Sequence, residues 1–277
     1  MPTLVRDGIE LFYELDGEGA PAVYACGFGA HSSDLLALGL RAALGRHYRL
    51  LTVDNRGAGQ SRVAPGTTAT IDDMADDIAA ILDHEGMGAA HVLGISMGGC
   101  IAKTLALRHP GKVLSLVSAV SLAYSDQPNR GQFLLESGRE MRNRGIPRDL
   151  LNRYNAVFLL GEDVFRDTAI LEAWVNAPPD PLEMDQAGYD LQKYALERYD
   201  IRDRLGDIRT PTLVISSPDD LLVPPHYQDE IARRIPGALL KHFPGGHVFM
   251  MLPMYAAQFV ETVIGFWKQH EAAASAG

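Results

Sequence analysis

Short apolar runs alternate along this chain with longer segments in which apolar residues recur every three or four positions. The short runs are rich in Val, Leu and Ile and occupy residues 22–26, 50–53, 91–95, 114–119, 212–216 and, more weakly, 239–243. Such runs are typical of strands buried on both faces of a parallel sheet. Stripes at helical spacing within residues 71–82 and 259–267 predict helices between and after them. The alternation predicts a doubly wound α/β architecture.

Two regions depart from that alternation. Residues 3–6 and 9–14 alternate apolar with polar positions around an Asp7-Gly8 turn, which predicts an N-terminal hairpin. Residues 122–205 carry mostly helical patterns, and we expect them to form a helical cap inserted after the sixth strand. Residues 1–121 and 206–277 would then form the core. The ends of the insert fall at the carboxyl edge of the sheet, where open α/β folds bind ligands.

Composition narrows the class of protein. The chain has 277 residues, of which 47% are hydrophobic and 22% charged, as expected for one large globular domain with an insertion. Its formal net charge of −10 argues against nucleic-acid or anionic-membrane partners. The chain has only two cysteines, which fits a reducing compartment. It shows no signal peptide and no apolar stretch of about 18 residues that could cross a membrane, so we expect a cytoplasmic protein. The oligomeric state stays open, a homo-oligomer included.

The sharpest motif is Gly94-Ile-Ser-Met-Gly98, which lies between a predicted buried strand and a predicted helix. A serine in such a tight turn is lifted clear of the sheet, and the helix N-terminus places backbone N–H groups beside it. The two glycines are needed because a Cβ at either position would collide with neighbouring backbone. The alternative is a glycine-rich turn with a capping serine. The strand–turn–helix context favours Ser96 as a nucleophile.

A serine nucleophile needs a base, and the base needs an orienting carboxylate. His247 follows two glycines after the last predicted strand, and we select it from the nine histidines. Asp219 and Asp220 directly follow the strand at 212–216, and adjacent residues that leave a strand point in opposite directions. We expect Asp220 to serve His247, with Asp126 as the alternative should neither of the pair do so.

The chain resembles the α/β-hydrolase fold family, in its cap-bearing Ser-His-Asp branch. Five segments carry the resemblance in family order: Ala25-Cys-Gly-Phe-Gly, Asp54-Asn-Arg-Gly-Ala-Gly-Gln-Ser, the serine motif, Asp220-Leu-Leu-Val-Pro, and Gly246-His. The resemblance implies the chain order Ser96, Asp220, His247. It also implies oxyanion donors at the backbone N–H groups of Phe28 and Met97.

Cys26 departs from the family, which usually has histidine at this position. That histidine is not the base, so the triad is unaffected, but the means of holding the loop at residues 26–29 is left open. A reactive thiolate needs an accessible, electropositive setting. We therefore expect Cys26 and Cys100 to be packed thiols. We also expect Asp54 and Arg56 to pair with each other locally and organise their loop.

No cofactor or metal is expected. The chain lacks His-X-X-X-His and Cys-X-X-Cys spacings, and no glycine-rich phosphate loop follows the first strand. The acidic cluster within residues 72–77 opens a predicted helix, where carboxylates complement the helix dipole. A metal site there is the weaker interpretation.

The leading hypothesis is a hydrolase that cleaves a small-molecule ester or lactone through an acyl-enzyme on Ser96. The chain resembles the enol-lactonase and carboxylesterase branch, and also the aminoacrylate hydrolase of pyrimidine breakdown. Hydrolysis of a C–N or C–C bond and cofactor-free peroxidase chemistry are therefore alternatives on the same fold. A small-molecule receptor that retains the triad is a further alternative. Within the cap, Tyr124, Tyr154, Trp174 and Gln192 are candidates for lining the substrate pocket.

Overall fold

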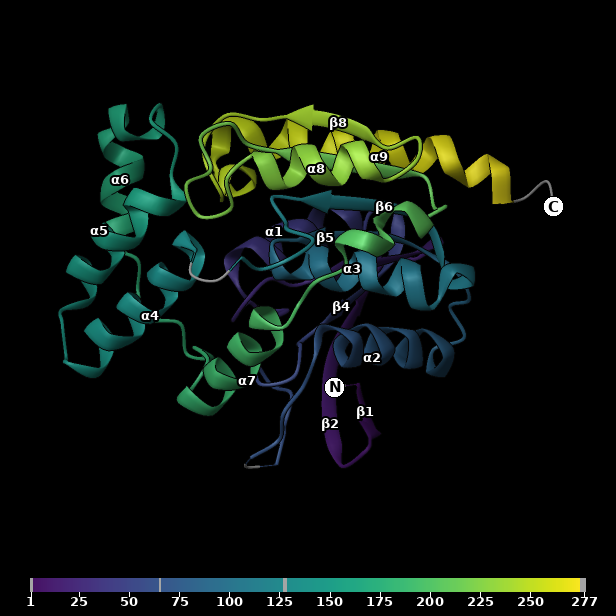
Figure 1. Ribbon diagram of the computed structural model, residues 1–277, viewed down its shortest axis with the longest axis horizontal. Coiled ribbons are helices and arrows are strands. Elements are labelled where there is room, and N and C mark those ends of the chain that lie inside the picture. Colours follow the sequence, from purple (N-terminus) through teal and green to yellow (C-terminus); the bar gives the residue numbers. More distant parts are fainter. Residues whose placement is uncertain (1, 65, 127–128, 275–277) are drawn as a thin grey trace.

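The computed structural model describes residues 2–64, 66–126 and 129–274, and its centre is an eight-stranded sheet in the order β1-β2-β4-β3-β5-β6-β7-β8 (Figure 1). The strands are β1 (Thr3–Arg6), β2 (Ile9–Asp16), β3 (Ala20–Ala25), β4 (Tyr48–Val53), β5 (Ala90–Ile95), β6 (Val113–Ala119), β7 (Thr212–Ser216) and β8 (Leu239–His242). β1 and β2 pair antiparallel, β2 joins β4 antiparallel, and every other pairing is parallel. The predicted hairpin and mostly parallel sheet are confirmed.

Five helices cover the two faces of the sheet: α1 (Leu35–Leu44), α2 (Ile71–His84), α3 (Met97–Arg108), α8 (His226–Arg234) and α9 (Pro253–Ala274). Side chains from α2, α3 and α8 form one hydrophobic core with the sheet, and those from α1 and α9 form the other. Along β3, Val23 and Ala25 pack into the first core, whereas Ala22 and Tyr24 pack into the second. Both faces of the strand are therefore buried, which explains its continuous apolar run.

The described residues between β6 and β7 form four α-helices: α4 (Arg130–Asn143), α5 (Arg148–Leu159), α6 (Thr168–Val175) and α7 (Gln186–Glu197). Where the chain leaves the core and where it returns, Tyr124 and Asp200 form an antiparallel bridge. In Figure 1, α4, α5 and α6 form a group to one side of the sheet, and α7 lies between that group and α2. Among the described residues, no helix is long and apolar enough to cross a membrane.

Candidate active site

Ser96 stands between β5 and α3 in a conformation that few L-residues adopt, with φ 55° and ψ −121°. A Cβ at Gly94 would lie 2.2 Å from the Gly98 carbonyl oxygen, and one at Gly98 would lie 1.9 Å from the Ala25 carbonyl oxygen. Both glycines are thus required for α3 to start so close to β3 and β5. Backbone strain of this kind is concentrated at functional sites, and it turns this serine out of the sheet.

His247 and Asp220 are joined by a buried hydrogen bond of 2.7 Å between Nδ1 and Oδ2. The other carboxylate oxygen, Oδ1, accepts the backbone N–H groups of Leu222 at 2.9 Å and Val223 at 2.8 Å. Asp220 is 1% exposed and His247 6% exposed. Each oxygen of Asp220 therefore has its own partner, so the imidazole is held by Nδ1 while Nε2 remains for a second partner.

The other two candidate carboxylates are placed differently. Asp219 is half-buried, and Asp126 is exposed with its Oδ1 4.0 Å from Arg202 Nη1. Of these three aspartates, only Asp220 contacts His247. The loops that carry Ser96, Asp220 and His247 follow β5, β7 and β8, so all three leave the carboxyl edge of the parallel sheet.

The loop after β3 is held from two directions. Asn55 Nδ2 donates to the Cys26 carbonyl oxygen at 3.0 Å, and the Gly29 N–H donates to Gln192 Oε1 at 2.8 Å. Within the part of the chain that the structure describes, the backbone N–H groups of Phe28 and Met97 donate to no protein acceptor. Two side-chain amides thus hold the loop in which Cys26 stands at the position of the family's usual histidine. The N–H groups of Phe28 and Met97 are left without a protein acceptor among the described residues.

A cavity of about 550 Å³ opens beside Ser96, Phe28 and Met97. Its apolar walls come from the insert, from the loop that carries Asp220 and from the start of α8: Leu122, Leu135, Leu196, Leu222, Val223 and Tyr227. Polar and charged residues from α4 and α7, including Arg130, Lys193 and Glu197, also line it. Lys193 is ion-paired with Glu197 and with Glu136. The arrangement suits a mainly apolar molecule that reaches Ser96 with one end.

The four insert residues expected to line the pocket lie outside the lining of this cavity. Tyr124 packs against Tyr227, Tyr154 packs against Phe158, and Trp174 Nε1 donates to the Asn152 carbonyl oxygen at 3.1 Å. Gln192 is fully buried and uses both ends of its amide on backbone groups. These three aromatic side chains thus pack against protein, and leucines of the insert line the cavity instead.

The prediction that Asp54 and Arg56 pair with each other is wrong. Asp54 accepts the backbone N–H groups of Ser32 and Gln60, at 2.6 and 2.8 Å. Arg56 forms a two-pronged ion pair with Asp77 on α2, at 2.6 and 2.8 Å. Both residues organise the loop after β4: Asp54 binds Gln60 within that loop and Ser32 outside it, and Arg56 binds a helix.

The acidic cluster of α2 is occupied by protein partners. Asp73 completes a capping box with Thr70, Asp77 binds Arg56, and Asp76 binds Arg108. The Arg108 guanidinium lowers the pKa of Asp76 to about 2. No group of three or more potential metal ligands is present among the described residues.

Both cysteines are fully buried, as expected. Burial raises the pKa of the Cys26 thiol well above its ordinary value, and it also raises the pKa of Cys100. A thiol with a raised pKa is a poor nucleophile at neutral pH. This setting argues against a thiolate reaction at either position.

Lys103 on α3 is a fully buried lysine that no sequence pattern indicated. Its Nζ donates to the Gly99 carbonyl oxygen at 2.7 Å and to the hydroxyls of Ser118 and Ser121 at 3.0 Å each. No carboxylate pairs with it among the described residues, and burial lowers its pKa to about 8. A lysine at a helical position gives no hint of burial, so nothing in its neighbours' sequence indicated it.

The sheet order, the strained serine turn and the buried Asp–His pair are the features of an α/β-hydrolase fold. The family model for the alpha/beta hydrolase fold matches residues 26–253, and the chain belongs to this family. It is a hydrolase-fold enzyme that acts on small molecules.

Individual relatives differ in what their names say they hydrolyse. A Serratia proteamaculans (strain 568) protein named "Putative carbamate hydrolase RutD" is 33% identical over 218 residues, covering 74% of this chain and 76% of that protein. The pimeloyl-[acyl-carrier protein] methyl ester esterase of Aeromonas hydrophila is 30% identical, over 75% and 80%. The crystal structure of the enol-lactonase from Burkholderia xenovorans LB400 matches with a TM-score of 0.80 and 26% identity, over 96% and 100%.

Proposed function

We propose that the protein is a serine hydrolase that cleaves a small-molecule ester or lactone through an acyl-enzyme on Ser96. The observation that carries the proposal is the buried hydrogen bond between His247 Nδ1 and Asp220 Oδ2, in loops at the same sheet edge as the strained Ser96. In this arrangement Asp220 holds the imidazole in the tautomer whose Nε2 accepts a proton.

In the first half of the reaction, Ser96 Oγ attacks the substrate carbonyl carbon while His247 Nε2 takes the hydroxyl proton. The carbonyl oxygen becomes an oxyanion, and the unsatisfied N–H groups of Phe28 and Met97 are the donors that would stabilise it. The tetrahedral intermediate collapses, the bond to the alcohol oxygen breaks, and His247 gives its proton to that oxygen. The acyl group stays on Ser96.

In the second half, His247 removes a proton from water, whose oxygen attacks the acyl carbon. The same two N–H groups would stabilise the second oxyanion. Collapse breaks the bond to Ser96 Oγ, which recovers its proton from His247, and the free acid leaves. The fully buried carboxylate of Asp220 supports the positive charge of the imidazolium in both halves.

The cavity supports an apolar substrate body, and we propose that residues 122–205 act as its cap. Leu135 on α4 and Leu196 on α7 face Leu222 and Val223 of the core across the cavity. The esterase and the enol-lactonase among the relatives agree with cleavage of an acyl–oxygen bond. The relative named for carbamate hydrolysis favours a second candidate, in which the same residues cleave a C–N bond.

A substrate panel tests both candidates. Purified protein is assayed with p-nitrophenyl esters of increasing acyl length, with a set of lactones, and with carbamates and small amides, each alongside Ser96→Ala. We expect ester or lactone turnover that Ser96→Ala abolishes, and mass spectrometry should find the acyl group on Ser96. Turnover of carbamates or amides alone would favour the second candidate, and activity that persists in Ser96→Ala would overturn the nucleophile assignment.

A further inference from the structure

The side chain of Gln192 joins two loops of the core to a helix of the insert. Its Oε1 accepts the Gly29 N–H at 2.8 Å, and its Nε2 donates to the Arg56 carbonyl oxygen at 3.0 Å. The side chain is fully buried, and both bonds span more than a hundred residues of sequence. Because an N–H can face only the amide oxygen and a carbonyl only the amide nitrogen, the orientation of this amide is fixed by its partners.

The first two turns of α7 are built to bring Gln192 to that position. Asp185 caps the helix by accepting the Gly188 N–H at 2.8 Å. Gly188 lies against Gly57 so closely that a Cβ on Gly188 would stand 1.9 Å from the Gly57 carbonyl oxygen. One residue further on, the Tyr189 ring meets the Phe28 ring edge-on, with centroids 5.4 Å apart. The helix therefore contacts the loop of Phe28 and Gly29 through a ring and an amide, and the loop of Gly57 through its backbone.

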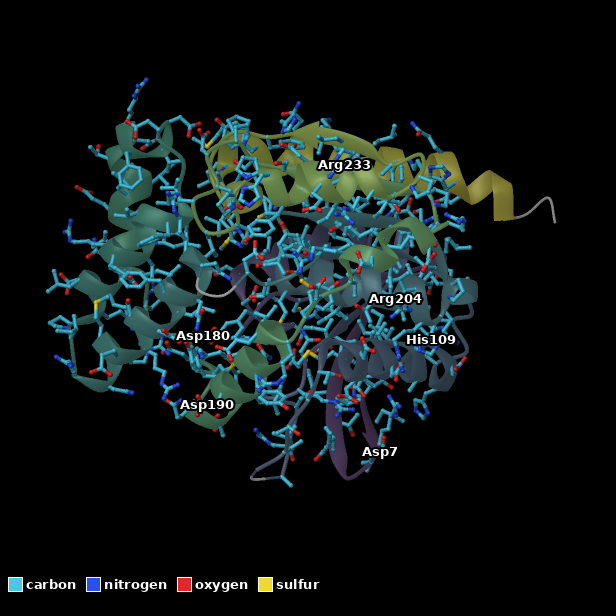
Figure 2. All side chains as sticks on the ribbon, viewed as in Figure 1. Asp7, His109, Asp180, Asp190, Arg204 and Arg233 are labelled. Carbon is cyan, nitrogen blue, oxygen red and sulfur yellow. The ribbon has the colours of Figure 1, made fainter. Side chains whose placement is uncertain are left out.

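A second contact ties the same loop to the insert just before α7. His31 Nε2 lies 2.8 Å from Oδ2 of Asp180, which Figure 2 labels in the segment between α6 and α7. His31 is 2% exposed and follows Gly29 by two residues. The loop after β3 is thus bonded to the insert at Gly29 and at His31, and the core supplies the Asn55 bond at Cys26.

We infer that Gln192 is a positioning residue that sets the oxyanion geometry from within the insert. By binding the Gly29 N–H, it fixes the peptide that follows Phe28, whose own N–H has no protein acceptor among the described residues. This inference rests on the proposed function, because Phe28 has that role only if Ser96 forms a tetrahedral intermediate. Gln192 itself does not line the cavity, so it acts through Gly29 and not on the substrate.

Displacing a hydrogen-bond donor from the oxyanion should lower kcat more than it raises KM, because the negative charge develops only in the transition state. Gln192→Met keeps the volume of the side chain and removes both hydrogen bonds. We expect kcat to fall by about 10²-fold, as for the loss of one oxyanion donor, with KM changed by about threefold or less. Binding of a trifluoromethyl ketone matched to the best ester of the panel should weaken by a similar factor, because its adduct on Ser96 carries the same oxyanion.

Two further variants keep the test decisive. Gln192→Glu retains an acceptor for the Gly29 N–H and loses donation to Arg56, so we expect it to recover about tenfold in kcat over Gln192→Met. Asn152→Leu is the matched control. It removes the hydrogen bond between α5 and α6 that Asn152 Nδ2 donates to the Val175 carbonyl oxygen, and it does not touch the loop of Phe28 and Gly29. It should leave kcat unchanged. Melting temperature and circular dichroism are measured for every variant.

The outcomes separate this inference from the proposed function. If Ser96→Ala is inactive but Gln192→Met keeps the wild-type kcat and inhibitor affinity, the inference is overturned and the proposed function stands. Equal losses in kcat for Gln192→Met and Asn152→Leu would also overturn it, because general loosening of the insert would then explain both. Activity that persists in Ser96→Ala overturns both proposals.

Discussion

The two sides of Ser96 are supported by different parts of the molecule. On the side of the base, Asp220 and His247 follow β7 and β8, and Asp220 is fixed by its own loop through the N–H groups of Leu222 and Val223. On the side of the oxyanion, Gly29 is fixed by Gln192 of the insert. Asp220 is therefore fixed by the core, whereas the loop of His247 also contacts the insert, where the Val248 N–H donates to the Leu159 carbonyl oxygen at 3.3 Å. Changes around Gln192 should affect transition-state stabilisation before they affect the pairing of Asp220 with His247.

The sharpest way to break the base side is Asp220→Asn. Without the carboxylate, His247 loses both its correct tautomer and the support for its positive charge, so we expect kcat to fall by about 10⁴-fold. Asp219→Asn is the adjacent control and should lose about tenfold or less, because Asp219 does not contact His247. Steady-state kinetics on folded variants decide the matter, and a larger loss in Asp219→Asn would reassign the acid.

Lys103→Met tests α3, the helix that begins directly after Ser96. The pKa of Lys103 is lowered by burial from 10.5 to about 8, so between these values the unfolded chain binds more protons than the folded one. The contribution of this lysine to stability therefore increases as pH rises through that window, by at most about 3 kcal/mol. We expect the difference in unfolding free energy between wild type and Lys103→Met to change with pH between 8 and 10.5.

Urea titrations at several pH values measure this difference, and the exposed Lys268 supplies the control variant Lys268→Met. Ionisations elsewhere in the chain cancel in the comparison with wild type. A difference that stays constant from pH 7 to 10.5 for Lys103→Met would mean that Lys103 does not titrate in this window.

Gly188→Ala separates the two sides of Ser96 more gently. The added Cβ would stand 1.9 Å from the Gly57 carbonyl oxygen, so α7 must shift and carry Gln192 with it. We expect kcat to fall by between about tenfold and a hundredfold, part or all of the value of one oxyanion donor. Gly138→Ala on α4 is the control, since its Cβ would meet nothing closer than 3.9 Å. The low-field NMR resonance of the His247 Nδ1 proton should be unchanged in both variants.

The smallest effect is expected at the cavity wall. Leu196→Ala enlarges the cavity without touching the loop of Phe28. The ratio of kcat/KM for long-chain esters to kcat/KM for short-chain esters should therefore rise by about fivefold. Trp174→Ala lies outside the cavity lining and should lower the melting temperature while leaving relative rates across the panel unchanged. The opposite pattern would return Trp174 to the pocket.

The sheet, the hairpin and the serine turn could be predicted from sequence because short-range patterns encode them. Buried strands need continuous apolar runs, and the turn at Ser96 needs glycines at fixed offsets. Contacts between distant residues could not be predicted in this way. Arg56 pairs with Asp77 and not with nearby Asp54, because loop and helix meet only after the sheet has formed.

The insert gave the least reliable predictions. Tyr124, Tyr154 and Trp174 are large and partly polar, which suggested a pocket, yet the contacts of these side chains are with other parts of the protein: Tyr227 of α8, Phe158 of α5 and the Asn152 carbonyl oxygen. Gln192 was expected to line the pocket, but its amide binds backbone groups and does not line the cavity. A single sequence indicates which side chains are amphipathic without indicating which neighbour they face.

The close approach of Gly57 and Gly188 has a consequence for protein engineering. Exchanging the insert with that of another hydrolase is an obvious route to new substrates, and a graft cut at the ends of the insert would appear modular. The two backbones touch where neither residue can carry a side chain, so a donor segment with any larger residue at position 188 would push its last helix away from the recipient. Gly161 of the insert meets Gly245 and Gly246 of the core in the same way, so a functional chimera should inherit residues 159–161 as well as 185–192 from this chain.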